Sequence, residues 1–201
     1  STSIDFEKND FIEGLNLSES GTLTGEYKDN DLIRFQLASK YHYRLPIFES
    51  LTFNIGSSIS YINNDNVDSF FHTYLGGMPG LKGYPFYSIQ GTKSTILDLS
   101  IRTPIFKEKH HKFNWAIFQN STIAGIFQIG DAWQGRDISF DTFKRSLGIQ
   151  WRLNGFSFYN YPTAIEVEFH QPLDKFTLSI NDNIISYGEE GRTYVKILFD
   201  F

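Results

Sequence analysis

Hydrophobic and polar residues alternate with a period of two along most of this chain. Such alternation predicts β-strands, because successive side chains of a strand point to opposite faces of a sheet. Seven segments are expected to form strands, and TSIDFEK near the start makes an eighth: 32–45, 50–62, 94–106, 113–133, 143–153, 163–173 and 192–201. Because no amphipathic helix of useful length can be found, the predicted fold class is all-β and antiparallel.

The expected connections between these strands differ in length. Those at about 46–49, 107–112 and 154–162 are short, whereas three are long: about 9–31, 63–93 and 174–191. The connection at 134–142 is intermediate in length. Up-and-down strands show this alternation when one end of the sheet carries tight turns and the other end carries elaborated loops, as in outer-membrane barrels.

The two faces of the predicted strands differ in polarity. In 94–106, Leu97, Leu99 and Ile101 share one face, and Asp98, Ser100 and Arg102 share the other. In 163–173, the corresponding sets are Ile165, Val167 and Phe169 against Glu166, Glu168 and His170. This pattern fits a soluble sheet over a core as well as a barrel with lipid outside and a wet lumen inside. Most segments reach the 9 to 11 residues of a membrane strand, and Trp115, Trp133 and Trp151 near the segment ends suit an interfacial girdle, so the pattern favours the membrane barrel.

Composition narrows the choice of partners and cofactors. The 201 residues contain 18 Lys and Arg against 23 Asp and Glu, which gives no electrostatic footprint for nucleic acid. Cysteine is absent, so neither a disulfide framework nor a thiolate metal site is expected. No segment approaches the length of an apolar spanning helix, and the first ten residues do not resemble a signal peptide.

Catalytic motifs are also missing from the sequence. The five histidines are scattered, and the adjacent pair His110 and His111 lies in a charged short connection that is typical of a solvated turn. Glu166 and Glu168 share a strand face, but neighbouring charges are usual on a polar wall. We therefore expect no enzyme activity, no metal and no cofactor.

Residues 74–91 stand apart from the alternating pattern. They read YLGGMPGLKGYPFYSIQG, with five glycines, two prolines and several aromatic residues. This stretch resembles the long loop of the bacterial surface-antigen barrel superfamily, which includes the BamA and TamA assembly factors. In that loop a Gly-Gly pair leads to a hydrophobic-Arg-Gly-aromatic tetrad. Further matches follow in the family's order, with LSIRTPIF, GIFQIGDAW and PTAIEVEFHQPLDKF, and the resemblance covers nearly the whole chain. Within the superfamily it is most similar to the C-terminal barrels attached to TolB-like proteins of Bacteroidetes-type bacteria.

The resemblance implies a transmembrane barrel of 16 antiparallel strands, of which residues 1–201 would supply the eight C-terminal ones. The long loop 63–93 would fold into the lumen, whereas composition alone favours an ordinary surface loop. An eight-stranded barrel is too narrow to hold such a loop, which supports the reading as part of a larger barrel.

The tetrad here is Leu81, Lys82, Gly83 and Tyr84. In the family, the arginine of the tetrad is held by acidic residues of the wall strands. This chain has Lys82 instead, and Ser100 and Gln128 occupy the matching acidic positions. Lysine cannot reproduce the planar fork of arginine. Asp98, on the same face as Ser100, is the expected replacement partner on the lumen wall, and an exposed Lys82 without a partner is the alternative. Asp131 is the other nearby acid, but period two places it on the face opposite Gln128 unless a bulge near Gly130 intervenes. The terminal strand, with Phe199 and Phe201, would close the barrel.

Two functions follow from this resemblance. One is a barrel for outer-membrane protein assembly or translocation, with client outer-membrane proteins or periplasmic accessory proteins as partners. The other is a passive outer-membrane anchor for a periplasmic propeller or esterase domain. Both place the chain among the lipids of the outer membrane of a Gram-negative bacterium.

Overall fold

The computed structural model describes residues 2–12, 15–26, 32–44, 51–107, 111–113, 116–135, 139–158, 161–180 and 183–199, the first three ranges as backbone only. Trp115, His110 and Phe201 lie outside the described residues. Within these residues no helix is long and apolar enough to cross a membrane.

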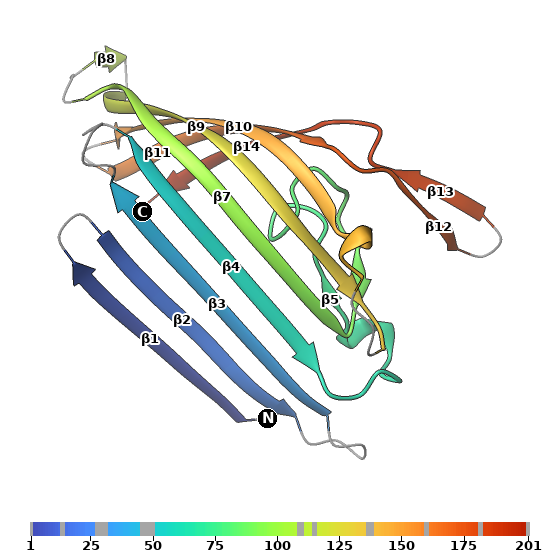
Figure 1. Ribbon diagram of the computed structural model, residues 1–201. Helices are drawn as coiled ribbons and strands as arrows, with labels where there is room; N and C mark the ends of the chain where they lie inside the picture. The colour runs from blue at the N-terminus through green and yellow to red at the C-terminus, as the bar shows by residue number, and fades with distance from the viewer. Residues whose placement is uncertain are drawn as a thin grey trace.

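One curled antiparallel sheet dominates the molecule (Figure 1). Its main path contains β1 (Thr2–Ile12), β2 (Leu15–Glu26), β3 (Leu32–Arg44), β4 (Thr52–Ile62), β7 (Lys93–Phe106), β9 (Ala116–Trp133), β10 (Lys144–Ser157), β11 (Tyr161–Pro172) and β14 (Arg192–Phe199). These strands lie side by side in sequence order, and β8 (His111–Phe113) pairs with β9. The predicted all-β class and the predicted pairing of the segments 143–153 and 163–173 are confirmed.

The longer connections between the strands contain short elements of secondary structure. Two-stranded pairs are formed by β5 (Thr73–Tyr74) with β6 (Gln90–Gly91), and by β12 (Phe176–Ile180) with β13 (Asn183–Tyr187). Single 3₁₀ turns occupy Ser69–Phe71 (η1) and Phe140–Thr142 (η2). The hairpin of β12 and β13 projects away from the sheet (Figure 1).

The strand count of eight is wrong, because the predicted long connection 9–31 contains β2. This strand pairs along its whole length with both β1 and β3. Its sequence, LNLSESGTLTGE, is rich in Ser, Gly and Thr, and only its leucines suggest alternation. Hydrogen bonding to two neighbours therefore overrides a weak local preference. The segment around Trp151 is also longer than predicted, so this residue lies inside β10 and not near its end.

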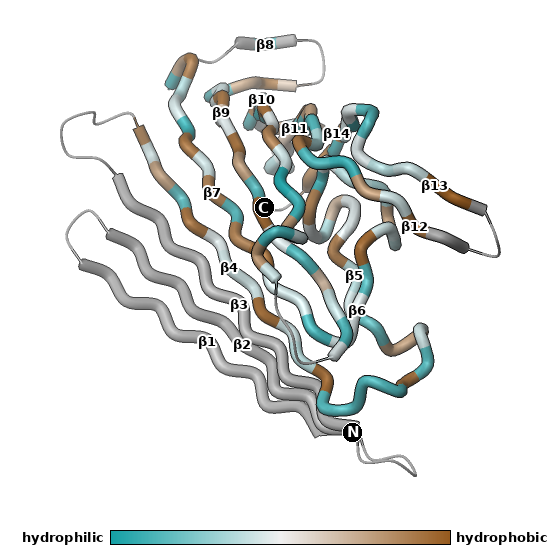
Figure 2. The backbone as a smooth tube through the Cα atoms, turned by 45° about the vertical axis from the view of Figure 1, so that its right-hand side comes forward, coloured by the Kyte–Doolittle hydropathy of each residue, from teal (hydrophilic) through white to brown (hydrophobic). Residues whose placement is uncertain are grey.

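The sheet is apolar on one face and polar on the other. Hydrophobic and hydrophilic residues alternate along β4, β7 and β9 (Figure 2). Large apolar side chains of the outer face are exposed: Ile59, Leu97, Ile101, Ile123, Leu147, Ile149, Phe169, Val195, Ile197 and Phe199. Polar side chains of the inner face are buried: Ser94, Gln128, Ser146, Gln150, Glu166, Glu168 and His170. Leu99, Ile165 and Val167 also follow the predicted outer face but are half-buried. This distribution is the reverse of a water-soluble sheet, in which the apolar face is covered.

The long loop between β4 and β7 covers part of the polar face. It runs from residue 63 to residue 92 and lies on the concave side of the sheet (Figures 1 and 2). The buried hydrophobic cluster of the described residues belongs to this loop and consists of Leu75, Leu81, Tyr84 and Ile89. Ile96, Ala132 and Phe176 pack against it from neighbouring elements.

Candidate functional site

The tetrad 81–84 sits in a compact turn inside the long loop. Leu81 donates its amide hydrogen to the Leu75 carbonyl at 2.6 Å, and Gly77 donates to the Tyr84 carbonyl at 2.9 Å. Gly77 has φ +88°, a conformation that glycine adopts without steric cost. The turn buries Leu81 completely and presents Lys82 to the sheet.

Lys82 forms an ion pair with Glu168 of β11. Its Nζ lies 2.6 Å from Glu168 Oε2, and the Glu168 side chain is 0% exposed. The Lys82 carbonyl also accepts a hydrogen bond from the Tyr194 hydroxyl of β14 at 2.9 Å. A charge-assisted contact to a buried carboxylate is stronger than a neutral hydrogen bond, so this pair is a principal attachment of the loop.

Glu168 has three further partners, all on the sheet. Its Oε1 accepts hydrogen bonds from Gln150 Nε2 at 2.7 Å and from Lys196 Nζ at 2.9 Å. Its Oε2 lies 3.1 Å from Nε2 of His170, which is itself fully buried. Both carboxylate oxygens are thus satisfied twice, which compensates for the cost of burying the charge.

Gln128 of β9 binds the backbone of the tetrad. Its Oε1 accepts hydrogen bonds from the Lys82 amide at 3.0 Å and from Ser146 Oγ at 3.1 Å. Its Nε2 donates to the Gly80 carbonyl at 3.1 Å and to Asp98 Oδ2 at 2.6 Å. A primary amide can both donate and accept, so Gln128 fixes the loop by its peptide groups and not by charge.

Gly83 lets the loop approach the sheet closely. A Cβ at this position would lie 2.7 Å from Ser146 Cβ and 3.1 Å from the Pro172 nitrogen. Any larger residue would therefore push the loop away from β10 and β11. The position needs glycine for its small size, since φ is not in the left-handed region here.

Tyr84 ties the loop to the ends of β10 and β11. Its ring is 0% exposed, and its hydroxyl donates to the carbonyls of Arg145 (3.0 Å) or Asp174 (2.9 Å). Burial raises the pKa of Tyr84 to about 12. Beside it, hydrogen bonds from the Arg145 guanidinium lower the pKa of the Asp174 carboxyl.

The predicted partners of Lys82 are placed differently. Asp98 accepts a hydrogen bond from Gln128, and Ser100 accepts one from Asn54, so neither is the ion-pair partner. The expectation for Asp98 is wrong because the path of the loop brings the Lys82 amine to Glu168 of β11 and not to Asp98 of β7. Asp131 is buried and forms an ion pair with Lys144 at 2.6 Å.

Phe199 lies at the end of β14 with an exposed side chain, apart from the tetrad. Sequence reasoning placed Glu168 on the polar face but did not connect it with Lys82. The signal that could have found Glu168 was the number of acidic residues on the polar face. A buried cation needs a buried anion, and β11 carries two glutamates on its polar side.

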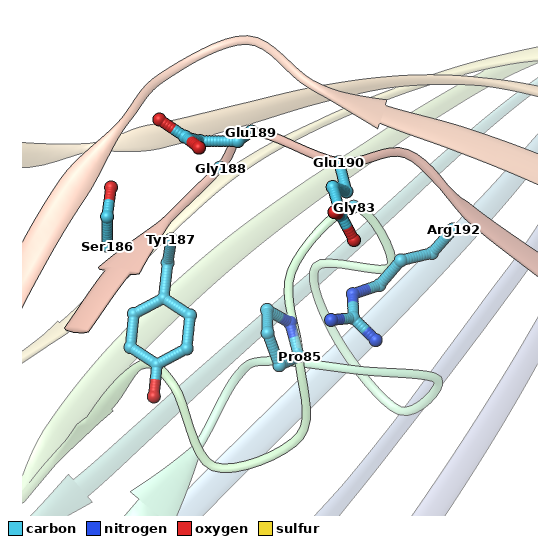
Figure 3. Close-up of a pocket in the computed structure, with 8 residues that line it drawn as sticks. All are labelled: Gly83, Pro85, Ser186, Tyr187, Gly188, Glu189, Glu190 and Arg192. Atoms are coloured by element: carbon cyan, nitrogen blue, oxygen red, sulfur yellow. The ribbon is translucent and has the colours of Figure 1, made fainter.

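A small pocket opens between the loop and the start of β14. It has a volume of about 260 Å³ and is lined by Gly83, Pro85 and residues 186–190 and 192. Figure 3 shows the Arg192 side chain reaching from the strand towards the loop beside Pro85. The loop therefore contacts the sheet closely at Gly83, and the pocket separates it from the hairpin of β12 and β13.

No family model, curated protein or solved structure matches this chain. Within the described residues, no group of three or more His, Asp or Glu side chains is arranged to hold a metal ion. The geometry itself defines a loop that is held on a polar sheet face by charge, amide and hydroxyl contacts.

Proposed function

We propose that this chain forms part of the wall of an outer-membrane β-barrel of the BamA-like superfamily, with the loop 63–92 as a plug in its lumen. The barrel would act in outer-membrane protein assembly or translocation. The ten strands described here would be completed by further strands of the same protein, since the path from β1 to β14 is open within the described residues.

The reversed polarity of the sheet is the observation that carries this proposal. Ile101, Ile149 and Val195 lie on three different strands of one face and are 49%, 58% and 66% exposed. Soluble monomers rarely expose a continuous apolar face of this kind. A lipid-facing wall requires it, and a wet lumen suits the buried ionic groups on the opposite side.

The attachment of the loop supports membership of this superfamily. Within the hydrophobic-cation-Gly-aromatic tetrad, Lys82 and Gly83 contact β9, β10, β11 and β14, and Tyr84 adds a hydrogen bond to β10. The cation meets a wall carboxylate, as the resemblance implies, although the residues differ. The chain would thus retain the principle of the family's attachment with a changed set of partners.

The membrane reading can be tested with two neighbouring residues of β7. Ile101→Arg places a charge on the apolar face, whereas Ser100→Arg places the same charge on the polar face. In the complete protein refolded into lipid vesicles, Ile101→Arg should lower stability by about 2–4 kcal/mol if it lies near mid-depth. Ser100→Arg should insert like the wild type. Heat-modifiable gel mobility reports the inserted fraction, and equal behaviour of the two variants would contradict the proposal.

The assembly role needs a separate measurement in cells. If the barrel assembles or translocates clients, depletion should lower the folded amounts of several other outer-membrane proteins. If it is a passive anchor, depletion should affect only the domain attached to it. Quantifying folded outer-membrane proteins by heat modifiability after depletion distinguishes these outcomes.

A further inference from the structure

A second group of charged side chains occupies the polar face, beyond the tetrad and towards the short connections. Arg102 of β7 and Arg152 of β10 lie in adjacent rows of the cross-strand register. The first row runs Arg102, Ala124, Gln150 and Glu168, and the second runs Pro104, Thr122, Arg152 and Glu166.

Arg102 has no anionic partner among the residues that the structure describes. Its guanidinium reaches across the small side chain of Ala124 and donates to Gln150 Oε1. No described carboxylate forms an ion pair with it, but Glu166 and Glu168 lie near enough to attract it electrostatically, and Arg152 lies near enough to repel it. A half-buried guanidinium offers five donors, of which one contact to a neutral amide uses only a part.

The nearby carboxylates are already engaged. Glu166 pairs with Lys196 at 2.7 Å and lies 3.7 Å from Arg152. Glu168 is held by Lys196 and Lys82, as described above. These two acids form ion pairs with Lys82, Lys196 and Arg152, and Arg102 is a fourth cation of this face. Asp98 adds a third acid two register rows away, so the cations outnumber the acids by one among these residues.

Two neighbouring features also favour the binding of an anion at this part of the polar face. The Thr122 hydroxyl, in the register row of Arg152, is buried and has no hydrogen-bond partner. The backbone register also places Arg44 of β3 in the row of Arg102, with only Thr52 between them.

We propose that Arg102 and Arg152 form a binding site for a phosphate-type oxyanion on the lumen wall. Guanidinium groups match phosphate oxygens with paired hydrogen bonds. Arg102 would supply the charge that no described ion pair takes up, while Arg152 would add donors beside the ones that it gives to Asn154 and Glu166. The ligand would be free phosphate or the phosphate of a lipid headgroup. This inference depends on the proposed function, because it requires the polar face to line a water-filled lumen.

The test uses the complete protein in detergent, after heat-modifiable mobility has shown that it is folded. Inorganic phosphate is titrated by calorimetry at constant ionic strength. The wild type should bind saturably, Arg102→Gln should weaken binding at least tenfold, and Arg102→Lys should give an intermediate affinity because it keeps charge but loses the fork. Lys175→Gln, which removes an exposed cation on the β11–β12 connection, serves as the control and should bind as the wild type does.

A water-soluble short-chain phosphatidic acid forms the second arm of the experiment. Binding that is tighter than that of phosphate and still depends on Arg102 would identify a lipid headgroup as the source, and equal affinities would identify the free anion. No saturable binding, or unchanged binding by both Arg102 variants, would overturn the site. Because folding is established first, that result would leave the barrel proposal standing, whereas a protein that never becomes heat-modifiable would count against the barrel itself.

Discussion

The ion pair between Lys82 and Glu168 is a principal attachment of the loop, and its two residues differ in how many other partners they have. Glu168 keeps Gln150, Lys196 and His170 as partners when Lys82 leaves. The wall carboxylate is therefore not left bare, and the loop loses only its own contact. Removing Lys82 should loosen the loop without collapsing the wall.

Lys82→Met tests this asymmetry. We expect a loss of about 1–3 kcal/mol in the free energy of unfolding, in the range for a hydrogen bond to a charged group. Proteolysis within 75–89 should become faster, while heat-modifiable mobility is retained. Lys175→Met removes an exposed ion pair to Glu189 and should change neither quantity appreciably. Similar proteolysis of both variants would show that the Lys82 contact does not hold the loop.

Gly83→Ala addresses the close approach to the wall. The added methyl group meets Ser146 Cβ, so the loop must shift, and overpacking of this kind costs about 1–3 kcal/mol. Gly125→Ala on β9 is the control, because nothing lies within 4 Å of its Cβ position. Urea unfolding in vesicles compares the two variants. The double change Gly83→Ala with Ser146→Gly should recover part of the loss, and the absence of any recovery would argue against this contact as the cause.

At the residue scale, the sequence identified the tetrad but not all of its partners. The tetrad could be recognised in the sequence because its four residues are contiguous. Glu168 and Gln150 lie about 70 to 90 residues further on, and only the register of β10 and β11 brings them under Lys82. The role of Gln128 could not be predicted, because its amide binds peptide groups of the loop at a position where the family has a charged side chain.

At the scale of elements, the loop acts as a clamp on the ends of two strands. The Tyr84 hydroxyl accepts from the Asp174 amide at 3.2 Å and donates its single hydrogen to the carbonyl of Arg145 or of Asp174, at the ends of β10 and β11. Phe176 packs on its ring at a centroid distance of 5.7 Å, so the hairpin is included in the same contact. One side chain thus joins three segments that are distant in sequence.

Tyr84→Phe should separate this hydroxyl from the packing of the ring. We expect a loss of about 1–2 kcal/mol near neutral pH, since buried carbonyls lose a donor. The raised pKa adds a second effect. The folded state keeps its proton to about pH 12 while the unfolded state releases it near 10, so this contribution is complete below pH 10 and is lost as pH rises to 12. The difference in unfolding free energy between wild type and Tyr84→Phe should therefore shrink over this range. A constant difference would contradict a buried, neutral hydroxyl.

Among the elements, strong alternation was predictable and weak alternation was not. The long strands β4, β7, β9, β10, β11 and β14 alternate large apolar residues with polar ones, and their existence was predicted from the sequence. For β2, polar and small residues hide the period, and the strand exists because both neighbours supply hydrogen bonds. The hairpin of β12 and β13 was likewise read as a long connection.

At the scale of the whole molecule, the described sheet has two ends. β1 pairs only with β2, and β14 pairs only with β11, within the residues that the structure describes. Each end strand thus presents a row of hydrogen-bonding groups to whatever lies beside it. Hydrocarbon does not tolerate such edges, because it offers no hydrogen-bond partners.

Residues 1–201 produced alone should therefore fail to become a heat-modifiable monomer in lipid vesicles, whereas the complete protein should succeed. The expected products of the isolated chain are aggregates or edge-to-edge oligomers. Cross-linking after refolding distinguishes these products. A monomeric, heat-modifiable product from the isolated chain would show that the sheet closes on itself and that no further strands are needed.

The buried hydrophobic cluster around Leu75, Leu81, Tyr84 and Ile89 has a consequence for folding. It belongs to the loop, and the sheet itself offers no comparable apolar interior among the described residues. In water, collapse would gather the apolar side chains of the outer face inward and so favour the opposite curvature of the strands. If the proposed function is right, the strands can form the barrel wall only once they are in contact with the bilayer. The loop could then take up its place only after the strands around it have paired.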